Sequence, residues 1–138
     1  MIFHCPSCSL DTLELLHSLN LPADDGFSDR AIQFLHCSVC DFSAAGFYQE
    51  RQAPTDELDH FCFRIPSGSS AKKFKELLAS CSTPTQKDCS CTAHSFLAGN
   101  TAEVTQKINQ EFHLDSVPMA LKVADGTENT DDLPDYLF

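Results

Sequence analysis

The stretches Cys5-Pro6-Ser7-Cys8 and Cys37-Ser38-Val39-Cys40 are two C-x-x-C steps separated by 28 residues. Each step places two thiol groups on one tight turn, so both can face the same point. Two such turns supply the four soft ligands of a tetrahedral Zn²⁺ site, with Zn–S distances of about 2.3 Å. Sulfur at every position leaves no coordination position for water. The spacing therefore predicts one structural zinc ion held by Cys5, Cys8, Cys37 and Cys40.

The alternative interpretation is that these cysteines are buried thiols or form disulfides. Disulfides persist in oxidising compartments, and Met1 to His4 lead into the first step without the basic and apolar segments of a secretory signal. Eight cysteines without such a signal are typical of a reducing cytoplasm, where they serve as metal ligands or small apolar residues. We therefore expect a cytoplasmic protein whose first four cysteines bind metal.

The residues around the two steps resemble a known class of metal-binding module. Ile2-Phe3 and Phe34-Leu35 are expected to be strand ends that lead into tight turns. Residues 1 to 52 thereby resemble the zinc-ribbon class, in which two hairpin turns clamp one metal ion. The chain departs from the commonest ribbon pattern because Ser9 and Asp41, and not glycine, follow the steps. Transcription factors, ribosomal proteins, antitoxins and enzyme appendages share this class, so the resemblance implies no single function.

Length and composition fit one or two small domains. The chain has 138 residues, of which 42% are hydrophobic, and this is enough for a packed core. No apolar run approaches 18 residues, so we expect no membrane span. Proline and polar residues between Gln52 and Glu57 predict a linker. We expect a zinc ribbon over residues 1 to 52, an α/β domain over residues 59 to 124 and an acidic tail over residues 125 to 138.

The net charge of −11 is unevenly distributed along the chain. Residues 1 to 58 carry nine acidic and two basic residues, residues 59 to 124 carry six and seven, and residues 125 to 138 carry five and none. Nucleic-acid binding requires lysine and arginine to replace counterions, and the ribbon has only Arg30 and Arg51. An acidic surface instead favours a basic protein partner, although it also serves solubility. Lys72, Lys73, Lys75 and Lys107 keep a nucleic-acid-associated protein as a further alternative.

Periodicity predicts the strands of the ribbon. Residues 9 to 21 fit both a strand and a helical face, and we favour the strand because ribbon turns return as hairpins. Pro22 to Asp29 is expected to be a loop. Residues 30 to 36 and 42 to 49 are expected to be strands on either side of the second step.

The remaining pattern predicts alternating strands and helices. Asn100 and Glu103 have the form of a capping box, and Ser70 is the expected N-cap of an earlier helix. The expected elements are a strand at 60–65, a helix at 71–81, a strand at 91–97, a helix at 101–112 and a strand at 117–123. This β-α-β-α-β order predicts an α+β protein: a four-cysteine zinc ribbon of β-hairpins followed by a small two-layer α/β sandwich.

One face of the predicted sandwich is expected to be open and could carry chemistry. The residues placed on it by alternation are His60, Cys62, Arg64, Thr92, His94 and Lys122. His60, Cys62 and His94 could converge there in a small metal- or thiol-dependent enzyme, but no nucleophile elbow or family-specific cysteine signature accompanies them. Cys81 and the step Cys89-x-Cys91-x-x-His94 could form a second metal site, or could be apolar and loop thiols.

The last residues combine acidic and apolar character. Five uncompensated acids predict disorder for Asp125 to Asp132, and the apolar end Leu133 to Phe138 is expected to dock on the protein or on a partner. Together these observations favour a non-enzymatic zinc-binding protein that acts through protein–protein interaction, as a regulator, adaptor or inhibitor. The enzyme and the nucleic-acid-associated protein are the alternatives.

Overall fold

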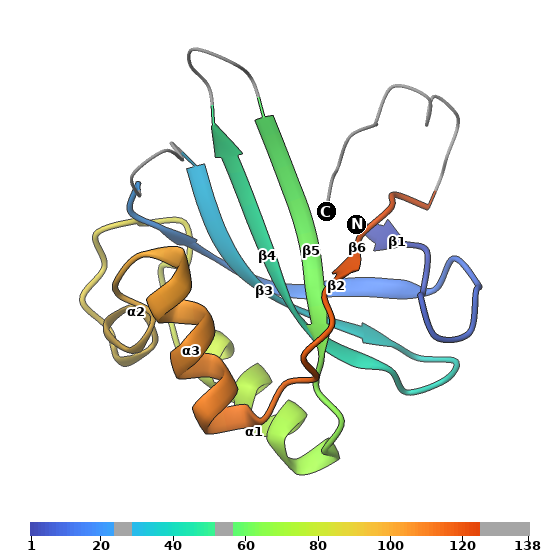
Figure 1. Cartoon of the computed structure of the whole chain (residues 1–138). Coiled ribbons are helices and arrows are strands. Elements are labelled where there is room, and N and C mark those ends of the chain that lie inside the picture. The colour runs from blue at the N-terminus through green and yellow to red at the C-terminus, as the bar shows by residue number, and fades with distance from the viewer. Residues whose placement is uncertain (24–28, 52–56, 125–138) are drawn as a thin grey trace.

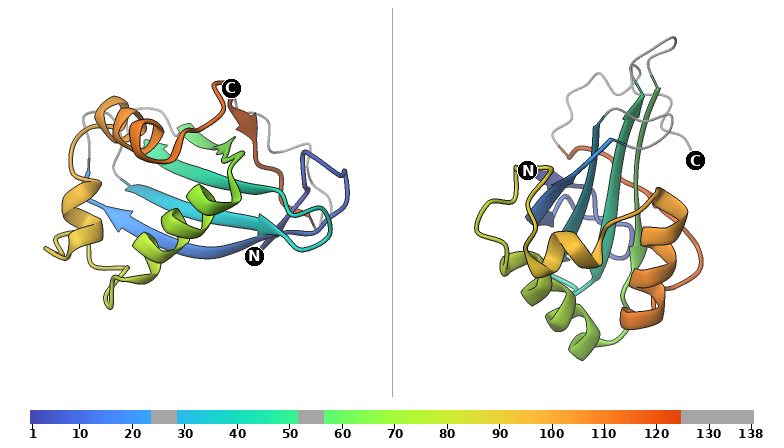
Figure 2. Two further views of the ribbon diagram at one scale, coloured as in Figure 1. Left: turned by 90° about the horizontal axis from the view of Figure 1, so that it is seen from below. Right: turned by 90° about the vertical axis from the view of Figure 1, so that its left-hand side faces the viewer.

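An antiparallel sheet dominates the protein. The computed structural model describes residues 1–23, 29–51 and 57–124, and in this part of the chain six strands pair in sequence order into one curled sheet (Figure 1). The strands are β1 (Ile2–Phe3), β2 (Leu13–Leu21), β3 (Asp29–Cys37), β4 (Ser43–Arg51), β5 (Glu57–Arg64) and β6 (Met119–Ala120). The helices α1 (Gly68–Ala79), α2 (Thr92–Phe96) and α3 (Thr101–Phe112) lie against one face of the sheet (Figures 1 and 2).

The three long N-terminal strands agree with the predicted ribbon strands. β2 and β3 form an antiparallel pair that reaches from Leu13 opposite Cys37 to Leu21 opposite Arg30. The register shifts between Leu15 and His17, which matches the ambiguous periodicity of residues 9 to 21. The strand interpretation of this segment is therefore confirmed.

The sheet continues across the predicted linker. β4 pairs with β5 from Ala44 opposite Arg64 to Arg51 opposite Glu57. The strands of the predicted ribbon and the first strand of the predicted sandwich thus share one sheet. The division into separate domains remains a prediction about folding units, and residues 52–56 of the linker lie outside the described part of the chain.

Helix α3 begins and ends where the sequence predicts. The Asn100 side chain accepts a hydrogen bond from the Glu103 backbone N–H at 2.9 Å, and the Glu103 carboxylate accepts one from the Asn100 backbone N–H at 2.9 Å. This reciprocal capping box satisfies two otherwise unpaired donors of the first turn. Helix α1 begins earlier than expected, because Ser67 and not Ser70 is its N-cap and accepts from the Ser70 N–H.

The predicted strand at residues 91–97 is wrong, because α2 occupies this segment. Ala93, His94 and Leu97 are the buried positions, and their spacing follows a helical turn and not the alternation of a strand. Cys91 is the N-cap, and its sulfur accepts a hydrogen bond from the His94 backbone N–H at 3.3 Å. Residues 91–97 have few large apolar side chains, so their sequence pattern does not distinguish the period of a helix from that of a strand.

The predicted strand at residues 117–123 is much shorter than expected. Met119–Ala120 pairs with β5, and the Leu121 N–H donates to the His60 carbonyl at 3.0 Å. Pro118, which has no N–H to donate, precedes this short strand. The observed order after the ribbon is β5-α1-α2-α3-β6, and the predicted β-α-β-α-β order is wrong. The broader expectation of an α+β protein with helices on one sheet face is confirmed.

The two faces of the sheet carry separate hydrophobic clusters. The helix-side core joins residues such as Phe34 and Phe47 of the sheet to Phe74, Ile108 and other helix residues. The second core lies on the opposite face near the cysteine turns and contains Phe3, Cys5, Leu13, Leu35, Cys37, Phe42, Ala44, Cys62 and Leu121.

The second core exists because the sheet curls and its edges meet. Phe3 forms a bridge with Val123, and the His4 backbone N–H donates to the Lys122 carbonyl at 2.9 Å. The sheet face expected to be open is therefore covered where β1 meets the segment after β6.

No helix in residues 1–23, 29–51 or 57–124 is long and apolar enough to cross a membrane. The predicted acidic tail, including the proposed docking segment Leu133 to Phe138, lies outside the described residues.

Candidate metal centres

The two C-x-x-C steps form matching turns, here called the knuckles. The first follows β1, and the second connects β3 to β4. The Cys5 N–H donates to the Leu10 carbonyl and the Cys37 N–H donates to the Phe42 carbonyl, both at 2.8 Å. Both sheet segments thus deliver their cysteines on turns of the same shape.

The residue after each knuckle has a left-handed backbone. Ser9 has φ 68° and Asp41 has φ 67°, and each donates its N–H to the carbonyl of the first cysteine of its knuckle at 2.9 Å. These are the positions where the resemblance leads one to expect glycine, which adopts a positive φ without steric cost. The departure from the ribbon pattern is therefore one of residue type, while the backbone conformation is the one glycine favours.

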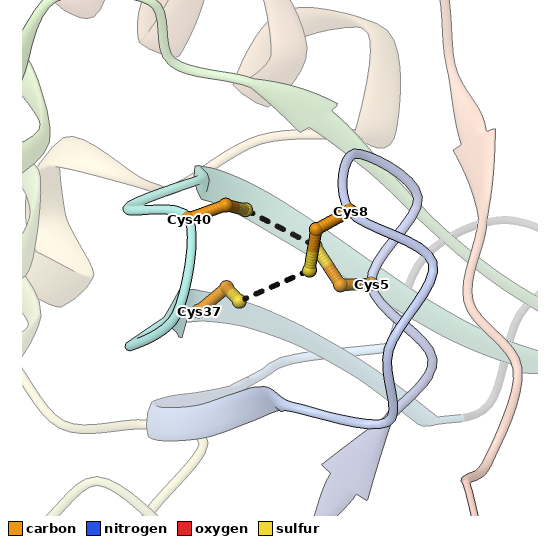
Figure 3. A group of neighbouring side chains, drawn as sticks. All are labelled: Cys5, Cys8, Cys37 and Cys40. Carbon is orange, nitrogen blue, oxygen red and sulfur yellow. Dashed lines mark hydrogen bonds between the residues drawn. The ribbon is translucent and has the colours of Figure 1, made fainter.

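The four knuckle cysteines converge on one point (Figure 3). Their sulfur atoms all lie within 4.8 Å of one another, with Cys5 to Cys40 at 3.7 Å and Cys8 to Cys37 at 3.8 Å. A tetrahedral ion with Zn–S bonds of about 2.3 Å places its sulfurs about 3.8 Å apart. The sulfurs thus have the spacing of a zinc site, far from the S–S bond of about 2.05 Å in a disulfide. We call this group the knuckle cluster.

The electrostatics of the knuckle cluster also fit a cation. Burial raises the pKa of the Cys5 thiol to about 12. Burial acts in the same direction on Cys37, but hydrogen bonds from the Thr12 hydroxyl and from the backbone N–H groups of Cys40 and Val39 lower the pKa of that thiol to about 6. Several thiolates can share one buried point only when a positive charge compensates them. A divalent ion that prefers sulfur meets this requirement.

Thr12 is a site residue that the sequence interpretation missed. Its hydroxyl oxygen lies 3.0 Å from the Cys37 sulfur and 3.8 Å from the Cys8 sulfur. A hydroxyl donor at this distance orients a thiolate ligand and stabilises its charge. In the sequence, the available signal is that Thr12 lies four residues after Cys8. Its contact with Cys37 depends on the pairing of β2 with β3, which the sequence does not show.

The architecture around the knuckle cluster is consistent with a zinc-binding ribbon at one end of a larger sheet. The chain matches no family model, no curated protein and no solved structure.

His60, Cys62 and His94, which could have converged in the alternative enzyme site, do not come together on one sheet face. Cys62 is fully buried in the second core, and His60 is buried with its Nε2 2.8 Å from the Gln33 side-chain oxygen. His94 lies on α2, and its Nε2 is 2.9 Å from the Asn20 carbonyl oxygen. Burial raises the pKa of the Cys62 thiol to about 12, which is the opposite of what a nucleophile needs. These residues therefore do not form the site that the alternative of a thiol-dependent enzyme requires.

A second group of potential ligands is assembled around α2. Cys81, Cys89, Cys91 and His94 bring their ligand atoms within 4.8 Å of one another. The sequence left this group open between a metal site and unrelated thiols. The structure thus contains two groups, in its described part, that could hold a metal ion.

Replacing Ser9 by glycine should stabilise the first knuckle. Removing the side chain relieves a left-handed strain of about 1–2 kcal/mol, offset by about 0.5–1 kcal/mol of added chain entropy in the unfolded state. Ser9→Gly should therefore raise the free energy of unfolding by about 0.5 kcal/mol in a denaturant titration. Ser9→Ala keeps the strain and is the control. Equal stability of the two variants would contradict this interpretation of the turn.

His60 should make the protein sensitive to acid. Burial lowers the pKa of His60 to about 4 from an ordinary value of 6.5. Between these values the unfolded chain binds the proton and the folded chain does not, so stability falls as the pH drops from 6.5 to 4. The loss should be about 3 kcal/mol, at about 1.36 kcal/mol for each pH unit.

The measurement is the free energy of unfolding against pH for the wild type and for His60→Gln, which retains a donor for Gln33. Protonation of the cysteines changes the free energy of unfolding equally in both proteins, so it cancels in the difference between their curves. The wild type should lose about 3 kcal/mol more than the variant over this range. Parallel curves would show that His60 does not carry the pH dependence.

Proposed function

We propose that the protein is a non-enzymatic zinc-binding protein that works by binding another protein in the cytoplasm, as a regulator, adaptor or inhibitor. The observation that carries the proposal is the knuckle cluster, whose four sulfurs have the spacing of a closed tetrahedral site. When bound, zinc at Cys5, Cys8, Cys37 and Cys40 supplies structural cross-linking and no open position for a reacting water. In this proposal the metal holds the two knuckles in place, and the surface that they form binds the partner protein.

The exposed apolar residues of the knuckles support a binding surface. Leu10 and Val39 are 49% and 58% exposed, and they lie on or next to the two turns that share the knuckle cluster. Met1 and Ile2, at 72% and 38% exposure, precede the first turn. Exposed large apolar side chains of this kind are available for contact with a partner.

The charge around these residues favours a basic partner. Asp11 follows Leu10, and Asp41 follows the second knuckle with its side chain 93% exposed. Residues 1 to 58 carry a net charge of −7, from nine acidic and two basic residues, which favours positively charged proteins over nucleic acid as partners. Exposed apolar side chains beside Asp11 and Asp41 are suited to binding a basic protein.

Loss of one knuckle ligand should release metal. Cys40→Ser changes an exposed ligand, so it disturbs the core little and isolates the effect on the ion. We expect the bound zinc, measured by elemental analysis, to fall by one ion for each chain, with a loss of stability above about 4 kcal/mol. Cys62→Ala removes a cysteine outside both groups and should keep the zinc. Unchanged zinc content in Cys40→Ser would overturn the site.

Partner binding should depend on the apolar residues of the knuckles. The double variant Leu10→Ser with Val39→Ser should retain zinc, because both side chains are exposed, and should bind a partner captured from source lysate at least about tenfold more weakly. Val117→Ser, at a position 66% exposed, is the matched control and should bind normally. A chain lacking residues 133 to 138 separates any contribution of that terminal segment.

The decisive measurement is the affinity of the purified partner for each variant. Equal binding by the intact chain and by the double variant would exclude the knuckle surface. Failure to capture a partner with any variant would overturn the protein-binding proposal.

A further inference from the structure

The loop between α1 and α2 holds the second group of ligands. Residues 80–91 contain no helix or strand, yet Cys81, Cys89 and Cys91 of this loop meet His94 of α2. Loops of this length without secondary structure are uncommon in small domains unless something else fixes them. The convergence of three thiols and one imidazole is the feature to be explained.

The distances within the group match a metal site with three sulfurs and one nitrogen. The Cys81 and Cys89 sulfurs are 3.8 Å apart, and His94 Nδ1 lies 3.4 Å from the Cys81 sulfur and 3.3 Å from the Cys91 sulfur. A tetrahedral zinc ion with Zn–S bonds of about 2.3 Å and a Zn–N bond of about 2.0–2.1 Å gives separations of about 3.8 Å and 3.5 Å. The Cys81 and Cys89 sulfurs are too far apart for a disulfide.

The orientation of His94 selects the nitrogen that faces the sulfurs. His94 Nε2 lies 2.9 Å from the Asn20 carbonyl oxygen, which can only accept a hydrogen bond. Nε2 therefore carries the proton and donates, and the lone pair of Nδ1 points toward the three sulfurs. A ligating histidine usually donates its other N–H to a carbonyl or carboxylate in this way. Asn20 thus serves as the positioning residue for the imidazole.

A simple thiol–imidazole hydrogen bond explains less of this arrangement. One S–H donor would satisfy the Nδ1 lone pair, so Cys81 or Cys91 alone would suffice. The structure instead brings Cys89 to 3.8 Å from Cys81 as well, and all four ligand atoms lie within 4.8 Å of one another. Three thiolates and one neutral imidazole form a closed structural set for Zn²⁺.

We propose that Cys81, Cys89, Cys91 and His94 bind a second, structural zinc ion, which fixes the loop of residues 80–91 and α2 against β2. The site is independent of the proposed protein-binding function. The Asn20 N–H also donates to the Pro84 carbonyl at 2.8 Å, so β2 holds the loop and the imidazole at the same residue. A groove of about 820 Å³ borders the group at Cys91.

The first test is the zinc content and ligand set of the intact chain, purified under reducing conditions and supplied with Zn²⁺ alone. We expect two zinc ions for each chain by native mass spectrometry. X-ray absorption should show seven sulfur ligands and one nitrogen ligand in total, four sulfurs on one ion and three sulfurs with the nitrogen on the other. One ion surrounded by four sulfurs would overturn the second site and leave the knuckle site standing.

Variants assign the second ion to its ligands. Cys89→Ser and His94→Ala should each lose one ion, and the ion that remains should have four sulfur ligands. Cys8→Ser should show the reciprocal result, with the nitrogen-containing site retained, and Cys62→Ala should keep both ions. Two ions in both Cys89→Ser and His94→Ala would overturn the proposal. The intact-chain measurement decides the question even where a variant does not fold.

Discussion

Charge compensation among sulfur ligands is the constraint on which the structure depends. The four knuckle sulfurs lie within 4.8 Å of one another, and buried thiolates repel strongly at such distances. A divalent cation bound there would turn this repulsion into attraction, because each thiolate would then face a positive charge. The cluster ties the turn after β1 to the turn between β3 and β4. It thereby holds the start of the chain against the centre of the sheet.

Both hydrophobic cores include one of the cysteine groups. Cys5 and Cys37 belong to the second core, while Cys81 belongs to the helix-side core and Cys89 and Cys91 pack against it. Small cores bury limited apolar surface, so small domains often gain stability from metal ions or disulfides. Two cores on opposite faces of one curled sheet divide the available apolar residues further. A metal ion at each cysteine group would cross-link each core and add stability that the small apolar clusters lack.

The position of the knuckles decides which surface the protein can present. Leu10 and Val39 are exposed at the two knuckles, while the sulfurs of the four cysteines face one another. Asp11 and Asp41 lie beside these apolar residues in the chain, and the proposed basic partner rests on them and on the net charge of −11. In the proposed function, a structural metal centre and a binding surface share the same two turns, so partner binding would depend on metal content.

The sequence by itself determined the elements that depend on local rules. The C-x-x-C spacing predicted the turns that present Cys5, Cys8, Cys37 and Cys40, and the capping box of Asn100 and Glu103 predicted α3, because neighbouring residues fix both features. Tertiary structure decided the rest. The pairing of β4 with β5 made one sheet, the closure of Phe3 on Val123 buried Cys62 and His60, and β2 placed the Asn20 carbonyl against His94. These contacts join residues far apart in the chain, and no local spacing encodes which distant backbone group a side chain will meet.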